Sequence, residues 1–248
     1  MAAAIQAPIA FDPDKFRQTT RAQWESAAEA WDRWAPLLAR WLGPSTEAML
    51  DMAGVGAGSR VLDVAAGAGE QTLAAARRAG PTGRVLATDI SPTILGYARR
   101  AASRAGLANV DTRELDGERH GELAEGSFDA AISRVGLIYF PDQQRALRGI
   151  HHALRHGGRF AAVVYSTPDR NGFFSIPVGI IRRRPASHRP CPASPVLSRS
   201  APTACSRRHW SRRASATSRC AASTPRCTCP RRPSASVSSA NRSVRCTR

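Results

Sequence analysis

The sequence predicts an α/β fold in which a mostly parallel sheet carries helices on both faces. Two observations lead to this prediction. Between residues 59 and 165, short apolar runs alternate with segments of helical spacing. A turn that contains glycine also follows the first apolar run and opens a helix. Alternating strands and helices imply right-handed crossovers, and ligands of such sheets bind at the carboxyl ends of the strands.

Five strands and three helices account for this region. The strands are expected at Arg60–Ala65, Arg84–Thr88, Val110–Glu114, Phe128–Ser133 and Arg159–Tyr165. The helices are expected at Glu70–Ala79, Ser91–Ala105 and Gln143–Arg155. The second helix has a clear start, because serine is a preferred cap and proline fits the first helical position.

The segment before the first strand is also expected to be helical. Large apolar residues recur at helical spacing from Phe16 to Leu50, and Pro36 interrupts the pattern. We therefore expect two short helices, which form an N-terminal helical cap over residues 1–50. Their tryptophans are interpreted as packing residues, and the alternative is that they form part of a lid over a substrate. The main domain is expected over residues 51–181.

The composition changes abruptly near residue 182. Residues 1–181 contain 20 basic and 19 acidic residues, whereas residues 182–248 contain 16 arginines and no acidic residue. The tail is rich in Ser, Ala, Pro and Cys, so it cannot build a core and is expected to be unstructured. The formal net charge of +17 thus belongs to the tail and indicates nothing about partners of the main domain.

Two interpretations of the tail stay open. One is an arginine-rich segment that binds nucleic acid non-specifically through phosphates. We favour the other, that residues 182–248 are an out-of-frame translation of GC-rich DNA, which yields these residue types. The sheet would then lack its last strands, and Arg159–Tyr165 would be an unprotected edge that favours aggregation. Reading the gene in the other two frames tests this hypothesis.

The turn after the first strand indicates the kind of ligand. Residues 61–70 read VLDVAAGAGE, and Gly-x-Gly turns occur in dinucleotide-binding and in other nucleoside-binding folds. A pyrophosphate fingerprint requires a third glycine at position 72, where Thr72 stands, and Asp63 would repel phosphates. S-adenosylmethionine has no phosphate and carries an ammonium and a sulfonium, so a carboxylate at this turn favours it.

The second strand ends in another acid. Asp89 lies 20 residues after Gly69, at the tip of the neighbouring strand. A carboxylate there can accept hydrogen bonds from both hydroxyls of a ribose. The alternative is that Asp89 interacts with the dipole of the following helix. The preceding strand and the glycine turn favour the ribose.

From about residue 16 to residue 184 the sequence resembles the class I S-adenosylmethionine-dependent methyltransferases, particularly the ubiquinone/menaquinone-biosynthesis methyltransferases. Four ordered stretches carry the resemblance: VLDVAAGAGEQTLAAARR, VLATDISPTIL, DG before SFDAAISRVGLIYFPD, and LRHGGRFAAVVYS. It implies a Rossmann-like sheet, S-adenosylmethionine as cofactor, and methyl transfer to a small apolar acceptor. The acceptor would contact Phe173, Phe174 and Ile176.

The resemblance also implies which residues bind the cofactor at the first two strands. Asp63, Gly67 and Gly69 would contact its methionine end. Asp89 and Ile90 would contact its ribose.

The remaining cofactor residues implied by the resemblance come from later in the chain. Asp116 and Gly117 would hold the edge of the adenine, and Ser133 and Arg134 would line the pocket after the fourth strand. Ala65 in the first turn departs from the family, because many relatives have glycine there, although a methyl group is expected to be tolerated.

No catalytic residue is predicted. Methyl transfer is a displacement at a carbon bound to a positively charged sulfur, and it needs alignment and exclusion of water rather than an invariant base. His120, His151 and His152 are available, but the latter two lie on an expected helix and are interpreted as surface or packing residues. No metal site is expected either, because the cysteine spacing of the tail fits no zinc pattern.

Two further function classes stay open beside a methyltransferase. They are an NAD(P)-binding oxidoreductase and a non-catalytic protein whose tail binds nucleic acid. No signal peptide is apparent and no apolar run reaches the ~18 residues of a membrane helix. Because the first 190 residues also contain no cysteine, we expect a cytoplasmic protein. The family resemblance implies that it acts on a small molecule.

Overall fold

The structure is a computed structural model, which describes residues 11–183 and 242–247. Its sheet has the strand order β3-β2-β1-β4-β5-β6. The parallel strands are β1 (Arg60–Val64), β2 (Arg84–Asp89), β3 (Val110–Glu114), β4 (Phe128–Arg134) and β5 (Leu154–Val164). The predicted α/β fold with a parallel sheet is confirmed, and four of the five strands begin at the predicted residue.

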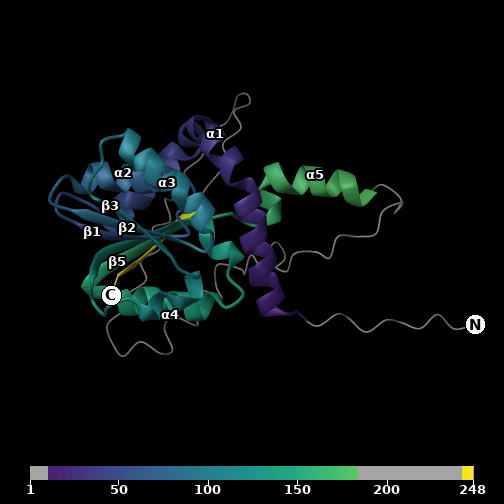
Figure 1. Cartoon of the computed structure of the whole chain (residues 1–248). Helices are drawn as coiled ribbons and strands as arrows, with labels where there is room; N and C mark the ends of the chain where they lie inside the picture. Colours follow the sequence, from purple (N-terminus) through teal and green to yellow (C-terminus); the bar gives the residue numbers. More distant parts are fainter. Residues whose placement is uncertain (1–10, 184–241, 248) are drawn as a thin grey trace, which may run out of the picture.

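Helices cover both faces of this sheet (Figure 1). α2 (Glu70–Ala79) and α3 (Pro92–Arg104) lie on one face together with the end of α1 (Pro13–Ala53), and α4 (Gln143–Ala153) lies on the other. Side chains of β1 alternate between the two cores, as the period of a strand requires. Val61 contacts the cluster that includes Met49 and Leu50 of α1, whereas Leu62 joins the cluster that includes Ile150 of α4.

The region before β1 differs from the prediction of two helices. α1 is one helix that contains Pro36 and Pro44, and it changes direction along its length (Figure 1). A proline inside a helix removes a hydrogen bond and clashes with the preceding turn. The helix nevertheless continues, because Met49, Leu50 and Ala53 at its end are buried in the core above the sheet.

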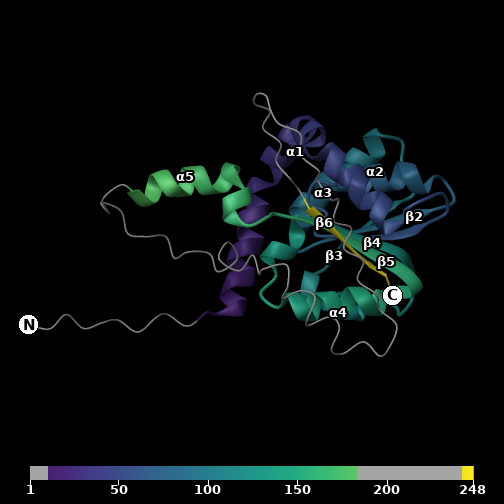
Figure 2. The same cartoon turned by 180° about the vertical axis from the view of Figure 1, so that it is seen from behind.

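The prediction that the sheet lacks further strands and leaves β5 as an unprotected edge is wrong. β6 (Arg242–Thr247) pairs antiparallel with β5, from Arg159 opposite Thr247 to Val164 opposite Arg242 (Figure 2). The unpaired N–H and C=O groups of an edge strand bind such a strand through the backbone, so the composition of β6 matters little.

Within the segment expected to be an unstructured tail, the structure describes two short stretches. Residues 242–247 form β6, and Arg182 and Arg183 complete α5 (Gly172–Arg183), which extends away from the sheet (Figure 1). The rest of the tail prediction, including nucleic-acid binding, falls on residues 184–241 and 248, outside the described residues. Over the described ranges, no helix is both long and apolar enough to cross a membrane.

Gly69 fixes how closely α2 and α3 approach. It precedes α2 with φ +90°, and a Cβ added to it would lie 2.7 Å from Cβ of Ala98 in α3. Gly106 has a similar positive φ of +67°, but no atom lies within 4 Å of an added Cβ.

We expect Gly69→Ala to lower the free energy of unfolding by at least about 1 kcal/mol more than Gly106→Ala, because only the first adds a steric clash to the backbone strain. Urea unfolding of both variants measures the difference. Equal losses would show that α3 moves away from the turn at little cost.

Candidate functional site

The predicted site residues gather at one edge of the sheet. The strand order reverses between β1 and its neighbour β4, and ligands of open parallel sheets bind at the carboxyl ends of the strands near such a point. The turn after β1, the tip of β2, the loop after β3 and the end of β4 all lie at this edge. Together with Asp63 near the end of β1, they contain the ten residues that the family resemblance implies.

A buried carboxylate joins the tips of β1 and β2. Oδ2 of Asp89 accepts from the backbone N–H of Gly67 at 2.9 Å, and Oδ1 accepts from that of Ser91 at 3.0 Å. Burial raises the pKa of Asp89, and the backbone N–H groups of Ser91, Gly67 and Ile90 oppose the shift. Asp89 is 7% exposed, and a carboxylate has about four acceptor positions, so it retains capacity for a hydroxyl donor of a ligand.

The backbone at this edge is strained on both sides of the β1–β4 boundary. Ala65 after β1 has φ 56° and Val135 after β4 has φ 65°, a conformation that disfavours both side chains. The two turns are in close contact, since a Cβ added to Gly136 would lie 2.5 Å from Cβ of Ala65. Such strain persists where surrounding structure imposes it, and it concentrates at functional sites.

Asp63 is buried beside the turn and already has hydrogen-bond partners within the chain. Its side chain is 0% exposed, Oδ2 accepts from Thr72 Oγ1 at 2.5 Å, and Oδ1 accepts from Gln71 Nε2 at 3.3 Å. Burial raises the pKa of Asp63 from 3.8 to about 6, and the bonds from Thr72 and Gln71 oppose this. The carboxylate therefore stabilises the first turn of α2 by accepting hydrogen bonds from Gln71 and Thr72.

Arg134 is the cation closest to the end of β4. It forms an ion pair with Glu70 in the first turn of α2, and its Nη1 donates to Thr46 Oγ1 of α1 at 3.0 Å. Its neighbour Ser133 is fully buried and donates to the carbonyl oxygen of Val64 at 3.0 Å. Both predicted residues thus connect β4 to neighbouring elements at the edge.

An aspartate within the loop after β3 stabilises the conformation of that loop. Oδ1 of Asp116 accepts from the N–H of Glu118 at 2.9 Å and starts the short 3-10 helix η1 (Gly117–Glu122). Gly117 packs against Phe140, because an added Cβ would lie 2.2 Å from Cζ of that ring. Phe140 follows η2 (Gly136–Tyr139), so this glycine allows the loops after β3 and β4 to pack together.

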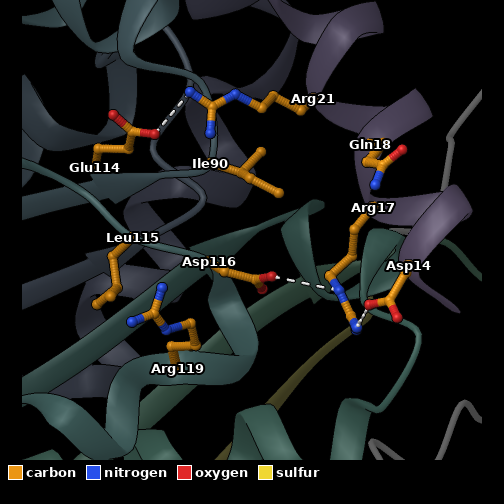
Figure 3. A pocket seen from close by; sticks show the side chains of 9 residues that line it. All are labelled: Asp14, Arg17, Gln18, Arg21, Ile90, Glu114, Leu115, Asp116 and Arg119. Atoms are coloured by element: carbon orange, nitrogen blue, oxygen red, sulfur yellow. Dashed lines mark hydrogen bonds and ion pairs between the residues drawn. The ribbon is translucent and has the colours of Figure 1, made fainter.

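A cavity of about 540 Å³ opens between this loop and the start of α1 (Figure 3). Arg17 lies across it, with Nη1 3.1 Å from Oε2 of Glu118 and Nε 3.8 Å from Oδ2 of Asp116. Nη2 of Arg21 lies 2.7 Å from Oε1 of Glu114. The cavity is lined by Asp14, Arg17, Gln18, Arg21, Ile90, Glu114, Leu115, Asp116 and Arg119.

These features fit a nucleoside. Gly67 has φ +59°, and an added Cβ would meet only Cδ1 of Ile94 at 3.9 Å, so its backbone is open to a ligand. The cavity is in the usual size range of ligand pockets, with apolar surface from Ile90 and Leu115 and a carboxylate from Asp116. Apolar surface suits the faces of a purine, and a carboxylate suits its exocyclic amine.

Aromatic rings gather at the ends of β4 and β5. Tyr165 contacts Phe174 with ring centroids 4.7 Å apart, and Tyr139 contacts Trp24 of α1 at 5.2 Å. Of the residues predicted to contact the acceptor, Phe174 and Phe173 are part of this group, since their ring centroids lie 5.0 Å apart. Phe173 and Ile176 are 66% and 64% exposed.

Sequence reasoning missed several residues that organise the site. Thr72 was considered only as a missing glycine, yet its hydroxyl binds Asp63. Glu70 was not singled out, although it pairs with Arg134. Its place in the first turn of α2 was a usable signal, since acids favour a helix start. The sequence marks His120 only as an available histidine, and the structure buries it completely.

Comparisons with known proteins agree on the central segment. Residues 61–158 match the family model described as a methyltransferase domain. Aklanonic acid methyltransferase DauC from Streptomyces sp. (strain C5) is 32% identical over 145 residues, which cover 58% of this chain and 64% of that protein. The ubiquinone/menaquinone biosynthesis C-methyltransferase UbiE from Klebsiella pneumoniae is 33% identical over 120 residues, 48% of this chain and 47% of that protein.

The chain spans between about half and two thirds of the length of the curated relatives it matches. Among solved structures, phosphoethanolamine N-methyltransferase 1 of Haemonchus contortus has a TM-score of 0.55 and 20% identity. That match covers 65% of this chain and 35% of the other. It shows a shared fold.

The raised pKa of Asp63 predicts a pH effect on stability. A buried acid with a raised folded pKa favours folding only while protonated, so the stability that depends on Asp63 falls as pH rises from about 4 to above 6. Asp63→Asn removes this group. We expect the unfolding free energy of the variant, minus that of the wild type, to increase over this range by on the order of 2–3 kcal/mol.

Asp129→Asn is a control of opposite sign. Hydrogen bonds from Arg60 and Arg155 outweigh burial and lower the pKa of Asp129, so this acid stabilises the fold when ionised. For Asp129→Asn, the unfolding free energy of the variant minus that of the wild type is expected to fall as pH rises toward about 4. Above about pH 4 it is expected to stay constant, because Asp129 is then ionised in both the folded and the unfolded state. A difference for Asp63→Asn that stays constant from pH 4 to 7 in urea titrations would contradict the assignment.

Proposed function

We propose that this chain, whose residues 61–158 form a methyltransferase domain, transfers a methyl group from S-adenosylmethionine to a small molecule. The observation that carries the proposal is the buried hydrogen bond between Gly67 and Asp89. It places a glycine turn with an open backbone beside a carboxylate that can accept from a ribose. Relatives that are named methyltransferases support the same activity.

Different residues are proposed to bind different parts of the cofactor. The turn after β1, with Ala65, Gly67 and Gly69, approaches the methionine end, near the charges of Asp63 and Glu70. Asp89 binds the ribose. Ile90, which lines the cavity, contacts the ribose beside Asp89, and the loop at Asp116 and Gly117 holds the edge of the adenine at the cavity. Ser133 and Arg134 form the wall on the β4 side.

The bound cofactor supplies an electrophilic methyl group on a positively charged sulfur. The chain is proposed to act by orientation, because in-line displacement depends on alignment and on a dry site. Tyr139, Tyr165 and Phe174 provide an apolar surface near the ends of β4 and β5 on which an acceptor can lie. No side chain is assigned as a base.

A dinucleotide is the weaker candidate. The position that a pyrophosphate fingerprint reserves for a third glycine is held by Thr72, which is fully buried and bonded to Asp63. A phosphate at this helix start would also lie near the charges of Asp63 and Glu70, which repel it. A cytoplasmic location is part of the proposal, supported by the lack of cysteine before residue 191.

Calorimetric titration of the full chain with S-adenosylhomocysteine and with NAD⁺ tests the proposal. We expect saturable binding of the first ligand alone. Asp89→Asn is expected to weaken that binding at least about tenfold, because a hydrogen bond to a charged group contributes about 1.5–3 kcal/mol. Asp111→Asn is the matched control, since Asp111 lies on β3 in an exposed ion pair with Arg84. Saturable binding of NAD⁺ alone would overturn the proposal.

A further inference from the structure

One buried polar side chain connects three elements of the site. Nδ1 of His120 lies 2.7 Å from the carbonyl oxygen of Gly117, and Nε2 lies 2.9 Å from Oγ1 of Thr88. That hydroxyl also lies 3.0 Å from the carbonyl oxygen of Asp63. His120 and Thr88 are both fully buried. A single imidazole therefore links η1 to β2 and, through Thr88, to β1.

The positions of the protons follow from the partners. A carbonyl oxygen only accepts, so Nδ1 of His120 carries the proton in the bond to Gly117. Burial lowers the pKa of His120; the Gly117 carbonyl and Asp116 oppose this, and Arg113 adds to it. The ring is therefore neutral at pH 7, and Nε2 accepts from the hydroxyl of Thr88. This hydroxyl has one proton, which it shares between Nε2 and the carbonyl of Asp63.

Both partners of the ring adjoin residues proposed to bind the cofactor. Thr88 directly precedes Asp89, the proposed ribose acid, and Gly117 directly follows Asp116, at the proposed adenine edge. β2 and η1 belong to segments separated by α3 and β3 in the chain. The two hydrogen bonds of His120 therefore set the spacing between the ribose side and the adenine side.

We propose that His120 is a positioning residue, which fixes the adenosine end of the cofactor site by tying the loop after β3 to the tip of β2. The inference rests on the proposed function, since it assigns a role toward the same cofactor. An apolar ring at position 120 would fill the space but would leave the carbonyl of Gly117 and the hydroxyl of Thr88 without this partner. Because those groups are buried, the loop would shift to find others.

Two isosteric variants test the inference, one at each partner of the His120–Thr88 hydrogen bond. His120→Phe removes both hydrogen bonds, and Thr88→Val removes the hydroxyl while keeping the shape of the side chain. The full chain of each variant is titrated with S-adenosylhomocysteine and with adenosine, well below its melting temperature. We expect binding at least tenfold weaker for each, with the same fold-change for both ligands, because the loss lies at the adenosine end.

Two further variants separate positioning from stability. His120→Asn keeps a donor on the Gly117 side and is expected to recover part of the affinity. Val85→Ala, on the same strand as Thr88 but in the core above the sheet, is expected to lower the melting temperature and leave the affinity unchanged. The double variant His120→Phe with Thr88→Val is expected to lose less affinity than the product of the single effects, because both act on one network.

The outcomes are distinct. If the wild type binds S-adenosylhomocysteine and both isosteric variants bind it equally well, His120 has only a structural role and the inference is overturned. If His120→Phe does not fold, Thr88→Val alone decides. If the wild type binds neither ligand, the proposed function itself fails, and the inference falls with it.

Discussion

The hydrogen bond from the backbone of Gly67 to the carboxylate of Asp89 is the interaction on which the rest of the site depends. It ties the turn after β1 to the tip of β2, at the edge where the strand order reverses. Because the turn is short and strained at Ala65, its path is set by contacts of this kind rather than by local preference. The other groups of the site are arranged around this pair.

Partly buried ion pairs hold the surrounding elements in place. Arg134 joins β4 to α1 and α2 through Thr46 and Glu70. Glu118 joins α1 to the start of α4, since it contacts Arg17 through one oxygen and accepts from the N–H of Asp142 at 2.7 Å through the other. Removing one partner of such a partly buried pair leaves the other charge without its counter-ion. The long helix α1 is thereby fixed across the same edge of the sheet that carries the site.

The features that could be predicted from the sequence are those set by residues close together in the chain. The glycine turn, the acid at Asp89 and the serine cap of α3 follow from short patterns, and Ser91 Oγ does accept from the N–H of Ile94 at 3.3 Å. The direction of the Asp63 side chain depends on a helix that follows, and the continuity of α1 through its prolines depends on tertiary burial. β6 pairs through backbone groups across a long stretch of chain, so no side-chain pattern reveals it.

A crystal structure of the complex with S-adenosylhomocysteine tests the central claim most directly. The account predicts a ribose hydroxyl within about 3.2 Å of an Asp89 oxygen, the Gly67 bond to the same carboxylate intact, and the purine in the cavity beside Ile90 and Asp116. A ligand bound elsewhere on the sheet, or an Asp89 turned away from both the turn and the ribose, would contradict it.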